Sequence, residues 1–159
     1  MVVLAQVLFA ASLAGAALFD LATRRIPDAF ALAIVAGFAL AAVSGAIGTS
    51  ALAGHLGAGA MVFAGAAALF FAGWMGGGDV KLMSAAALWI GAGGTPRFLV
   101  LVALAGGVVA LAVIAVRLLV RDPRAVLRRA FDSEEGLPYG VAIAASALIA
   151  GLPLEVVAG

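Results

Sequence analysis

The chain consists of long apolar runs that alternate with short polar or glycine-rich connections. There are six such runs, and apolar runs of this kind in a chain with few charges predict membrane-spanning helices. Their expected bounds are Val2–Phe19, Ile26–Ala46, His55–Gly73, Val80–Ile90, Phe98–Val120 and Leu137–Val157. The pattern therefore predicts an all-α polytopic membrane protein, a bundle of six transmembrane helices forming one membrane-embedded domain over residues 1–159.

The fourth run is short, and its length leaves open whether it crosses the bilayer or turns back. At about 1.5 Å per residue it covers less than the hydrocarbon layer, which is ~30 Å thick. If it crosses, the outer connections hold only Arg97 and His55, and the inner ones hold Arg24, Arg25, Lys81, Arg121, Arg124, Arg128 and Arg129. An excess of Lys and Arg is typical of the cytoplasmic side. We therefore expect six crossings with both termini outside.

The composition supports the membrane class and excludes several kinds of catalytic site. Of the 159 residues, 66% are hydrophobic and 11% are charged, a proportion that no water-soluble core absorbs. The chain has no cysteine and one histidine, so disulfides, a thiol nucleophile and a cysteine-bound metal are excluded. We expect no metal, cofactor or nucleic-acid partner. The first run has no basic start, and we therefore interpret it as a span rather than a cleaved signal peptide.

The stretch Gly76-Gly77-Gly78-Asp79-Val80-Lys81 is the strongest candidate for chemistry. Three consecutive glycines allow backbone conformations and close approaches that other residues block. Asp79 is then either a helix N-cap or a functional carboxylate at the end of a span, and the stretch alone favours neither. Asp20 ends the first run, and the expected topology puts both carboxylates at the inner membrane boundary.

Two carboxylates from different helices can act as one acid–base unit. The ionised one takes a proton from water, and the protonated one donates to the carbonyl oxygen or the leaving amine. Like charges held close together share a proton and titrate as a pair. Such a pair hydrolyses peptide bonds. Carboxylates in membranes also form proton relays in transporters or proton-conducting subunits, and they cap helices in purely structural subunits, so three classes stay open.

Three segments resemble the type IV prepilin peptidases. Residues Asp20–Asp28 resemble the first-aspartate motif of that family, Gly76–Leu82 resemble its GxGD motif, and Leu137–Ile143 resemble the Pro-Tyr-Gly stretch that opens its last span. The resemblance implies a membrane aspartic endopeptidase that removes the basic leader from prepilins or pseudopilins at the cytoplasmic face of the bacterial inner membrane. The size is similar to the short form that serves Tad/Flp pili and lacks the methyltransferase region.

The same resemblance assigns roles by motif position. It implies Asp20 and Asp79 as the catalytic pair, with an active-site backbone formed by Gly76, Gly77 and Gly78. It implies supporting roles for Lys81, Pro27, Asp28, Pro138 and Tyr139. From the residues alone, Pro27 suits the first turn of the second helix, and Asp28 suits contact with the dipole of that helix more than catalysis.

The only sizeable polar segment lies between the last two runs, at residues 121–136. Asp122 and Pro123 predict a helix start, after which Val126, Leu127 and Phe131 share one apolar face. We expect a short amphipathic helix on the inner leaflet, with its arginines on lipid headgroups.

Overall fold

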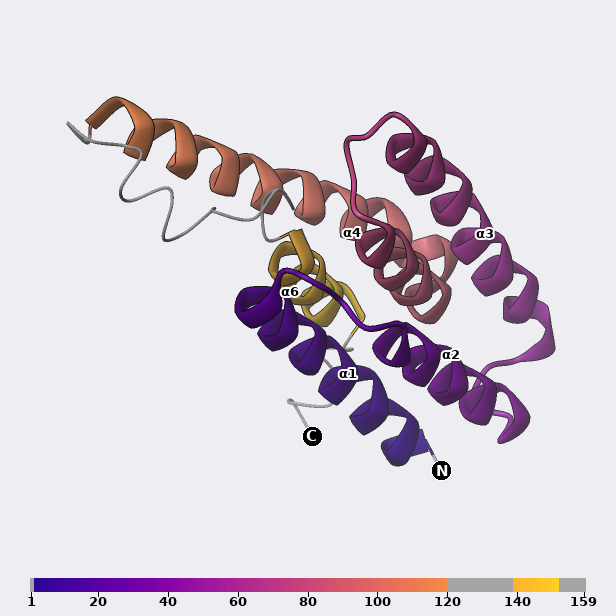
Figure 1. Cartoon of the computed structure of the whole chain (residues 1–159). Coiled ribbons are helices and arrows are strands. Elements are labelled where there is room, and N and C mark those ends of the chain that lie inside the picture. Colours follow the sequence, from indigo (N-terminus) through magenta and orange to yellow (C-terminus); the bar gives the residue numbers. More distant parts are fainter. Residues whose placement is uncertain (1, 120–138, 152–159) are drawn as a thin grey trace.

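The computed structural model describes residues 2–119 and 139–151 (Figure 1), and its regular secondary structure there is all helical. The helices are α1 (Val2–Thr23), α2 (Asp28–Val43), α3 (Thr49–Phe71), α4 (Gly77–Leu119) and α6 (Tyr139–Gly151). The all-α prediction is confirmed for these residues. The expected amphipathic helix within 121–136 and both ends of the expected last span lie outside them.

Three of the helices are long and apolar enough to cross a bilayer. They are α1, α3 and the part of α4 from Gly77 to Val109, the last by length and composition only, since its backbone breaks at Gly91. The apolar helices α2 and α6 have 16 and 13 residues, which is about 24 Å and 20 Å of helix. The chain is a membrane protein, but the described residues do not confirm the count of six spanning helices.

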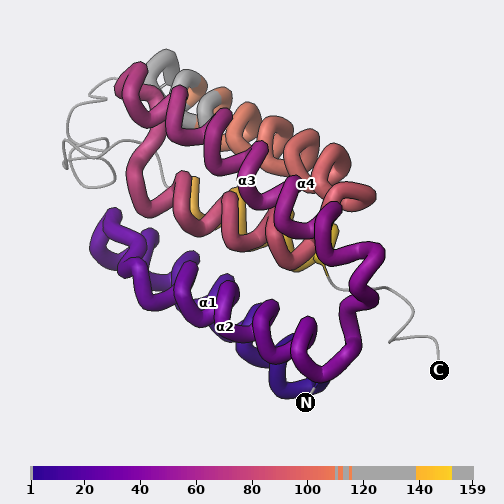
Figure 2. The backbone as a smooth tube through the Cα atoms, turned by 90° about the vertical axis from the view of Figure 1, so that its right-hand side faces the viewer, coloured from indigo at the N-terminus to yellow at the C-terminus, as the bar shows by residue number. Residues whose placement is uncertain are grey.

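Helix α4 occupies the centre of the fold. It packs against α2, α3 and α6, whereas α1 packs against α2 and α6. Figure 2 shows α1 beside α2, and α3 beside α4. Buried alanines at 85, 86 and 87 keep the surface of α4 flat, so the backbones of its neighbours can approach closely. Larger side chains then join the layers, as where the Phe9 ring stacks on Trp89 with centroids 4.7 Å apart.

The element α4 consists of two helical segments that meet at a break at Gly91. The backbone there has φ 79° and ψ 174°. Contacts with α6 show that the chain reverses at this break. The first segment runs parallel to α6, because Gly78 and Gly140 both approach Ile26 at one end and Ile90 lies against Gly151 at the other. The second segment runs the opposite way, because Gly94 lies near Ala150 and Gly106 lies against Tyr139 at the start of α6. The fourth and fifth predicted runs are therefore separate antiparallel segments.

The structure corrects the connection that we predicted between these two runs. We expected a glycine-rich loop over residues 91–96, but only Gly91 leaves the helical conformation. Two polar side-chain contacts lie at the break. The Thr95 hydroxyl donates to the Gly91 carbonyl at 2.7 Å, and His55 Nδ1 lies 2.9 Å from the Leu88 carbonyl oxygen. Both contacts lie next to the break, where the regular bonding of the helix is interrupted.

Gly91→Ala is expected to lower the stability of the fold. The observed backbone conformation is accessible almost only to glycine and costs other residues about 1–3 kcal/mol. An added Cβ would also lie 2.8 Å from Cε1 of His55. The measurement is the thermal unfolding midpoint in detergent. Gly93→Ala is the control, because a Cβ at Gly93 meets no atom within 4 Å; an equal midpoint for both variants would contradict the role of the break.

Candidate active site

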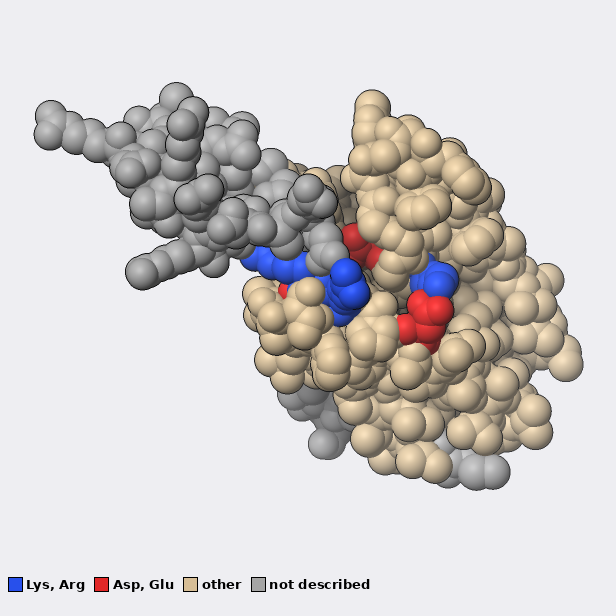
Figure 3. All heavy atoms as spheres, in the orientation of Figure 1, with Lys and Arg blue, Asp and Glu red and all other residues tan. Residues whose placement is uncertain are grey.

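Four chain segments converge at one end of the helix bundle. They are the last turn of α1, the connection from α1 to α2, and the first turns of α4 and α6. Figure 3 shows Lys and Arg side chains next to Asp side chains in one part of the face that is in view. In a membrane protein, ionisable side chains collected in one place mark a candidate functional site.

Asp20 is buried where the last turn of α1 meets the start of α6. The residue is 6% exposed. The backbone N–H of Gly140 donates to Asp20 Oδ2 at 3.0 Å, and the N–H of Val141 is a second hydrogen-bonding neighbour of the carboxylate. Both N–H groups belong to the first turn of α6 and have no partner within that helix. The N-terminus of α6 therefore holds and orients the Asp20 carboxylate.

The connection after Asp20 folds back over the site. Arg24 has a left-handed backbone conformation with φ 56°, which is uncommon for a residue with a side chain. It turns the chain directly after α1, so that Ile26 lies between α4 and α6. A Cβ at Gly78 would lie 2.9 Å from Ile26 Cβ, and one at Gly140 would lie 2.7 Å from Ile26 Cδ1. Glycine at both positions allows this approach.

Asp79 is in the first turn of α4, and its carboxylate bends back toward the start of the helix. It accepts a hydrogen bond from the backbone N–H of Gly76, as an acidic third residue does in a capping box. Gly76, which precedes α4, occupies the cap position, so the interpretation of Asp79 as the N-cap is wrong. The oxygen Asp79 Oδ1 is buried and has no hydrogen-bond partner among the described residues.

The structure brings the two candidate carboxylates together. Asp20 acts electrostatically on Asp79, although they lie on different helices and far apart in the sequence. Ile26, Gly78 and Gly140 form the contact that draws α1, α4 and α6 to this point. In this pair α6 orients one oxygen of Asp20, and Asp79 Oδ1 has no hydrogen-bond partner among the described residues. This arrangement is suited to holding and passing a proton.

The three glycines before Asp79 are not equivalent. A Cβ at Gly78 would lie 2.9 Å from Ile26 Cβ and 3.1 Å from the Ile26 carbonyl oxygen. A Cβ at Gly76 would lie 3.0 Å from Asp79 Oδ2. A Cβ at Gly77 would make an ordinary contact with the Phe70 ring at 3.5 Å. Space therefore requires glycine most strongly at Gly78, and least at Gly77.

Lys81 and Asp28 pair with each other at the rim of the site. The Lys81 ammonium donates to both oxygens of Asp28 at 2.7 Å. The two side chains are 50% and 59% exposed, and a pair as exposed as this contributes about 0–1 kcal/mol in water. Asp28 does begin α2, as predicted for contact with the helix dipole. The ion pair, which joins the start of α2 to the second turn of α4, was not predicted.

The other supporting residues lie further from the carboxylates or outside the described residues. Pro27 is the N-cap of α2 rather than part of its first turn, which corrects our prediction. The Tyr139 ring lies against Gly106 in the second segment of α4. Pro138 lies outside the described residues. No group of three His, Cys, Asp or Glu side chains that could hold a metal ion occurs in the part of the chain that the structure describes.

Sequence reasoning missed two residues of this site, Ile26 and Gly140. Both stand inside segments that we had singled out for their resemblance, Ile26 directly before Pro27 and Gly140 directly after Tyr139. The predicted supporting residues include the flanking Pro27 and Tyr139 but neither of these two. The available signal was that each lies next to a helix start, where a side chain or a backbone N–H is free to contact another helix.

Comparison with known proteins identifies the family of the chain. A family model described as the type IV leader peptidase family matches residues 7–111, about two thirds of the chain. The matched range includes Asp20, the connection with Ile26, and Asp79. No curated protein and no solved structure matches the chain.

Proposed function

The chain belongs to the type IV leader peptidase family, and on that premise we propose that it is an aspartic endopeptidase that cleaves prepilins or pseudopilins. Its site would act at the cytoplasmic face of the bacterial inner membrane and remove a short basic leader, as in the short enzymes of Tad/Flp-type pili. The observation that carries this proposal is the close packing of Ile26 against Gly78 and Gly140, which brings the end of α1 with Asp20 to the first turn of α4 with Asp79.

The proposed reaction is hydrolysis by a water molecule held between the two carboxylates. The ionised carboxylate removes a proton from the water, whose oxygen attacks the scissile carbonyl carbon. The protonated carboxylate donates to the carbonyl oxygen, and the leaving amine receives a proton as the C–N bond breaks. The amides of α6 keep Asp20 oriented, and Asp79 Oδ1, which no described residue hydrogen-bonds, would be available to the water or the substrate.

A transporter or proton-conducting subunit is less well supported. A proton path across a membrane needs ionisable or polar groups along its length. The acidic residues in the described ranges are Asp20, Asp28 and Asp79, and all three lie at the same end of the bundle. Family membership favours a peptidase as well.

The test is leader removal by the purified protein. A prepilin that carries its leader is incubated with the protein in detergent, and shortening is followed on a gel and by mass spectrometry. We expect one new N-terminus at the end of the leader and an unchanged rate in EDTA. An intact prepilin after incubation with folded protein would refute the function. Loss of cleavage in EDTA, restored by one divalent ion, would refute the metal-free mechanism.

The proposed orientation has its own test. Reporter fusions after Ala46 and Thr95 are expected to report the outer side, because the basic residues then gather on the inner side. Fusions after Trp74 and Phe131 are expected to report the cytoplasm. A cytoplasmic signal after Thr95 would contradict six crossings and would displace the later connections.

A further inference from the structure

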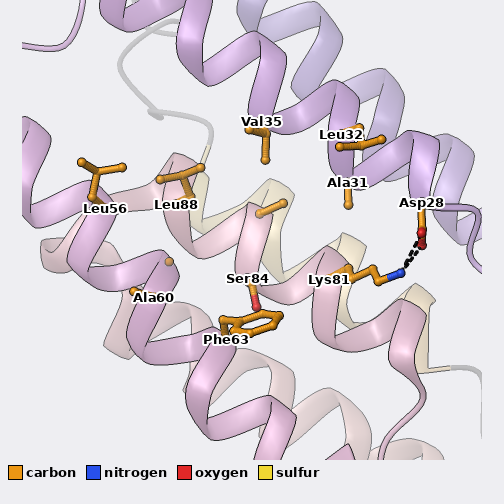
Figure 4. A pocket seen from close by; sticks show the side chains of 12 residues that line it. Asp28, Ala31, Leu32, Val35, Leu56, Ala60, Phe63, Lys81, Ser84 and Leu88 are labelled. Carbon is orange, nitrogen blue, oxygen red and sulfur yellow. Dashed lines mark hydrogen bonds and ion pairs between the residues drawn. The ribbon is translucent and has the colours of Figure 1, made fainter.

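A groove runs along the outside of the bundle between α2 and α3, with α4 as its floor (Figure 4). Its volume is about 480 Å³. The walls are apolar and open to the surroundings, since Leu32 on α2 and Phe63 on α3 are 66% and 52% exposed. In a membrane protein this groove faces lipid or another apolar chain.

The lining of the groove has the periodicity of a helix–helix contact. Each of the three helices contributes four residues at spacing i, i+3, i+4 and i+7, so the groove is straight and about two turns, or ~10 Å, long. Several of these residues are small, among them Gly59, Ala60 and Ala85. Small residues at such spacing let the backbone of another helix approach closely. The shape therefore fits an apolar helix.

One end of the groove reaches the candidate active site. Lys81 and Asp28 close that end, and Lys81 follows Asp79 by two residues on α4. Because the two charges of this ion pair compensate each other, the end is polar but has no excess charge to attract an anionic lipid headgroup. An apolar helix whose end lies at the polar membrane boundary would fit both the apolar walls of the groove and its polar end.

We propose that this groove binds an apolar helical segment of the substrate that follows the scissile bond. The inference rests on the proposed function. A substrate anchored in the bilayer by such a helix would lie along α2 and α4, with the start of its helix at the Lys81–Asp28 end. The residues before the helix would then reach Asp20 and Asp79. The groove would thus select membrane-anchored substrates and set the position of the cleaved bond.

The first test compares two substrates. One is a complete prepilin with its apolar segment, and the other is a short peptide that contains the leader and the cleavage site only. Ala60→Trp would fill the groove. We expect it to lower kcat/KM for the long substrate, relative to kcat/KM for the short one, by at least ~10-fold. The main cause should be a higher KM for the long substrate. Met61→Trp is the matched control, because Met61 is 75% exposed and does not line the groove. We expect it to leave the ratio unchanged.

The second test detects the helix directly. The chain has no cysteine, so single cysteines report on one position each. Ala60→Cys, combined with Asp79→Asn to hold the substrate uncleaved, is expected to crosslink to a cysteine in the apolar segment of the prepilin. Met61→Cys in the same background is expected not to crosslink. This test keeps the proposal open to refutation if Ala60→Trp fails to fold.

The outcomes separate the groove from the function. Absence of cleavage of both substrates by the wild-type protein would refute the proposed function itself. Cleavage of both substrates with the same ratio in wild type and Ala60→Trp, or equal crosslinking at Ala60→Cys and Met61→Cys, would overturn the groove proposal while the function stands. The groove would then be occupied by lipid acyl chains.

Discussion

Asp20→Asn and Asp79→Asn are each expected to lower the rate of leader cleavage by ~10²–10⁴-fold, the usual contribution of a positioned acid or base. Asparagine keeps the shape of the side chain but neither ionises nor accepts the catalytic proton. At Asp20 it can still accept the hydrogen bond from Gly140, so the local fold should persist. The measurement is the initial rate of prepilin shortening at equal amounts of folded protein.

The double variant separates a working pair from two independent groups. If Asp20 and Asp79 act as one unit, the double Asn variant should be scarcely slower than either single variant, because such effects are strongly non-additive. Asp28→Asn is the matched control, since its carboxylate pairs with Lys81 at the rim. We expect its turnover at saturating substrate to stay close to that of the wild type. Normal cleavage by either single variant would refute the two-aspartate mechanism.

Gly78→Val is expected to abolish leader cleavage while the protein still inserts into the membrane. The added Cβ would lie 3.1 Å from the Ile26 carbonyl oxygen and 2.9 Å from Ile26 Cβ, and the first of these is backbone that cannot rotate away. The start of α4 would therefore move from the connection after α1 and carry Asp79 away from Asp20. Even Gly78→Ala should lower the rate by at least ~10-fold, since a misplacement of ~1 Å can cost 10²-fold.

Gly77→Ala is the neighbouring control for this prediction. Its Cβ would meet the Phe70 ring at an ordinary 3.5 Å, and alanine favours a helix over glycine. We expect this variant to cleave at nearly the wild-type rate. Equal activity in Gly78→Val and Gly77→Ala would mean that the close contact with Ile26 has no part in positioning Asp79.

Much of the membrane architecture was predictable because its causes are local. Long apolar runs with few charges imply helices in lipid, since a lipid-exposed backbone must satisfy its own hydrogen bonds. The bounds were less accurate where tertiary contacts determine a helix end. Helix α3 begins at Thr49 instead of His55, and α4 continues through residues 92–96, where the glycines had predicted a loop. The cost of glycine in a helix is small enough for packing in the bundle to override it.

The candidate site was predictable only in part. Asp20 and Asp79 stood out because ionisable residues are rare in this chain and because two motifs resemble one family. The sequence did not predict that Lys81 pairs with Asp28 or that N–H groups of α6 donate to Asp20. It also did not predict that Ile26 packs against Gly78 and Gly140. Each joins residues on different helices, such as Gly140 with Asp20, and no pattern within one helix encodes such a contact.

The sequence by itself determined the membrane class and the helical content and singled out two candidate carboxylates, because long apolar runs and the rarity of charge are properties of the chain before it folds. Only the tertiary structure decided that α6 orients Asp20, that Ile26 holds α4 and α6 together, and that the chain reverses at one residue, Gly91. These features depend on how closely helices distant in the sequence approach, and that distance follows from side-chain volume at their contacts.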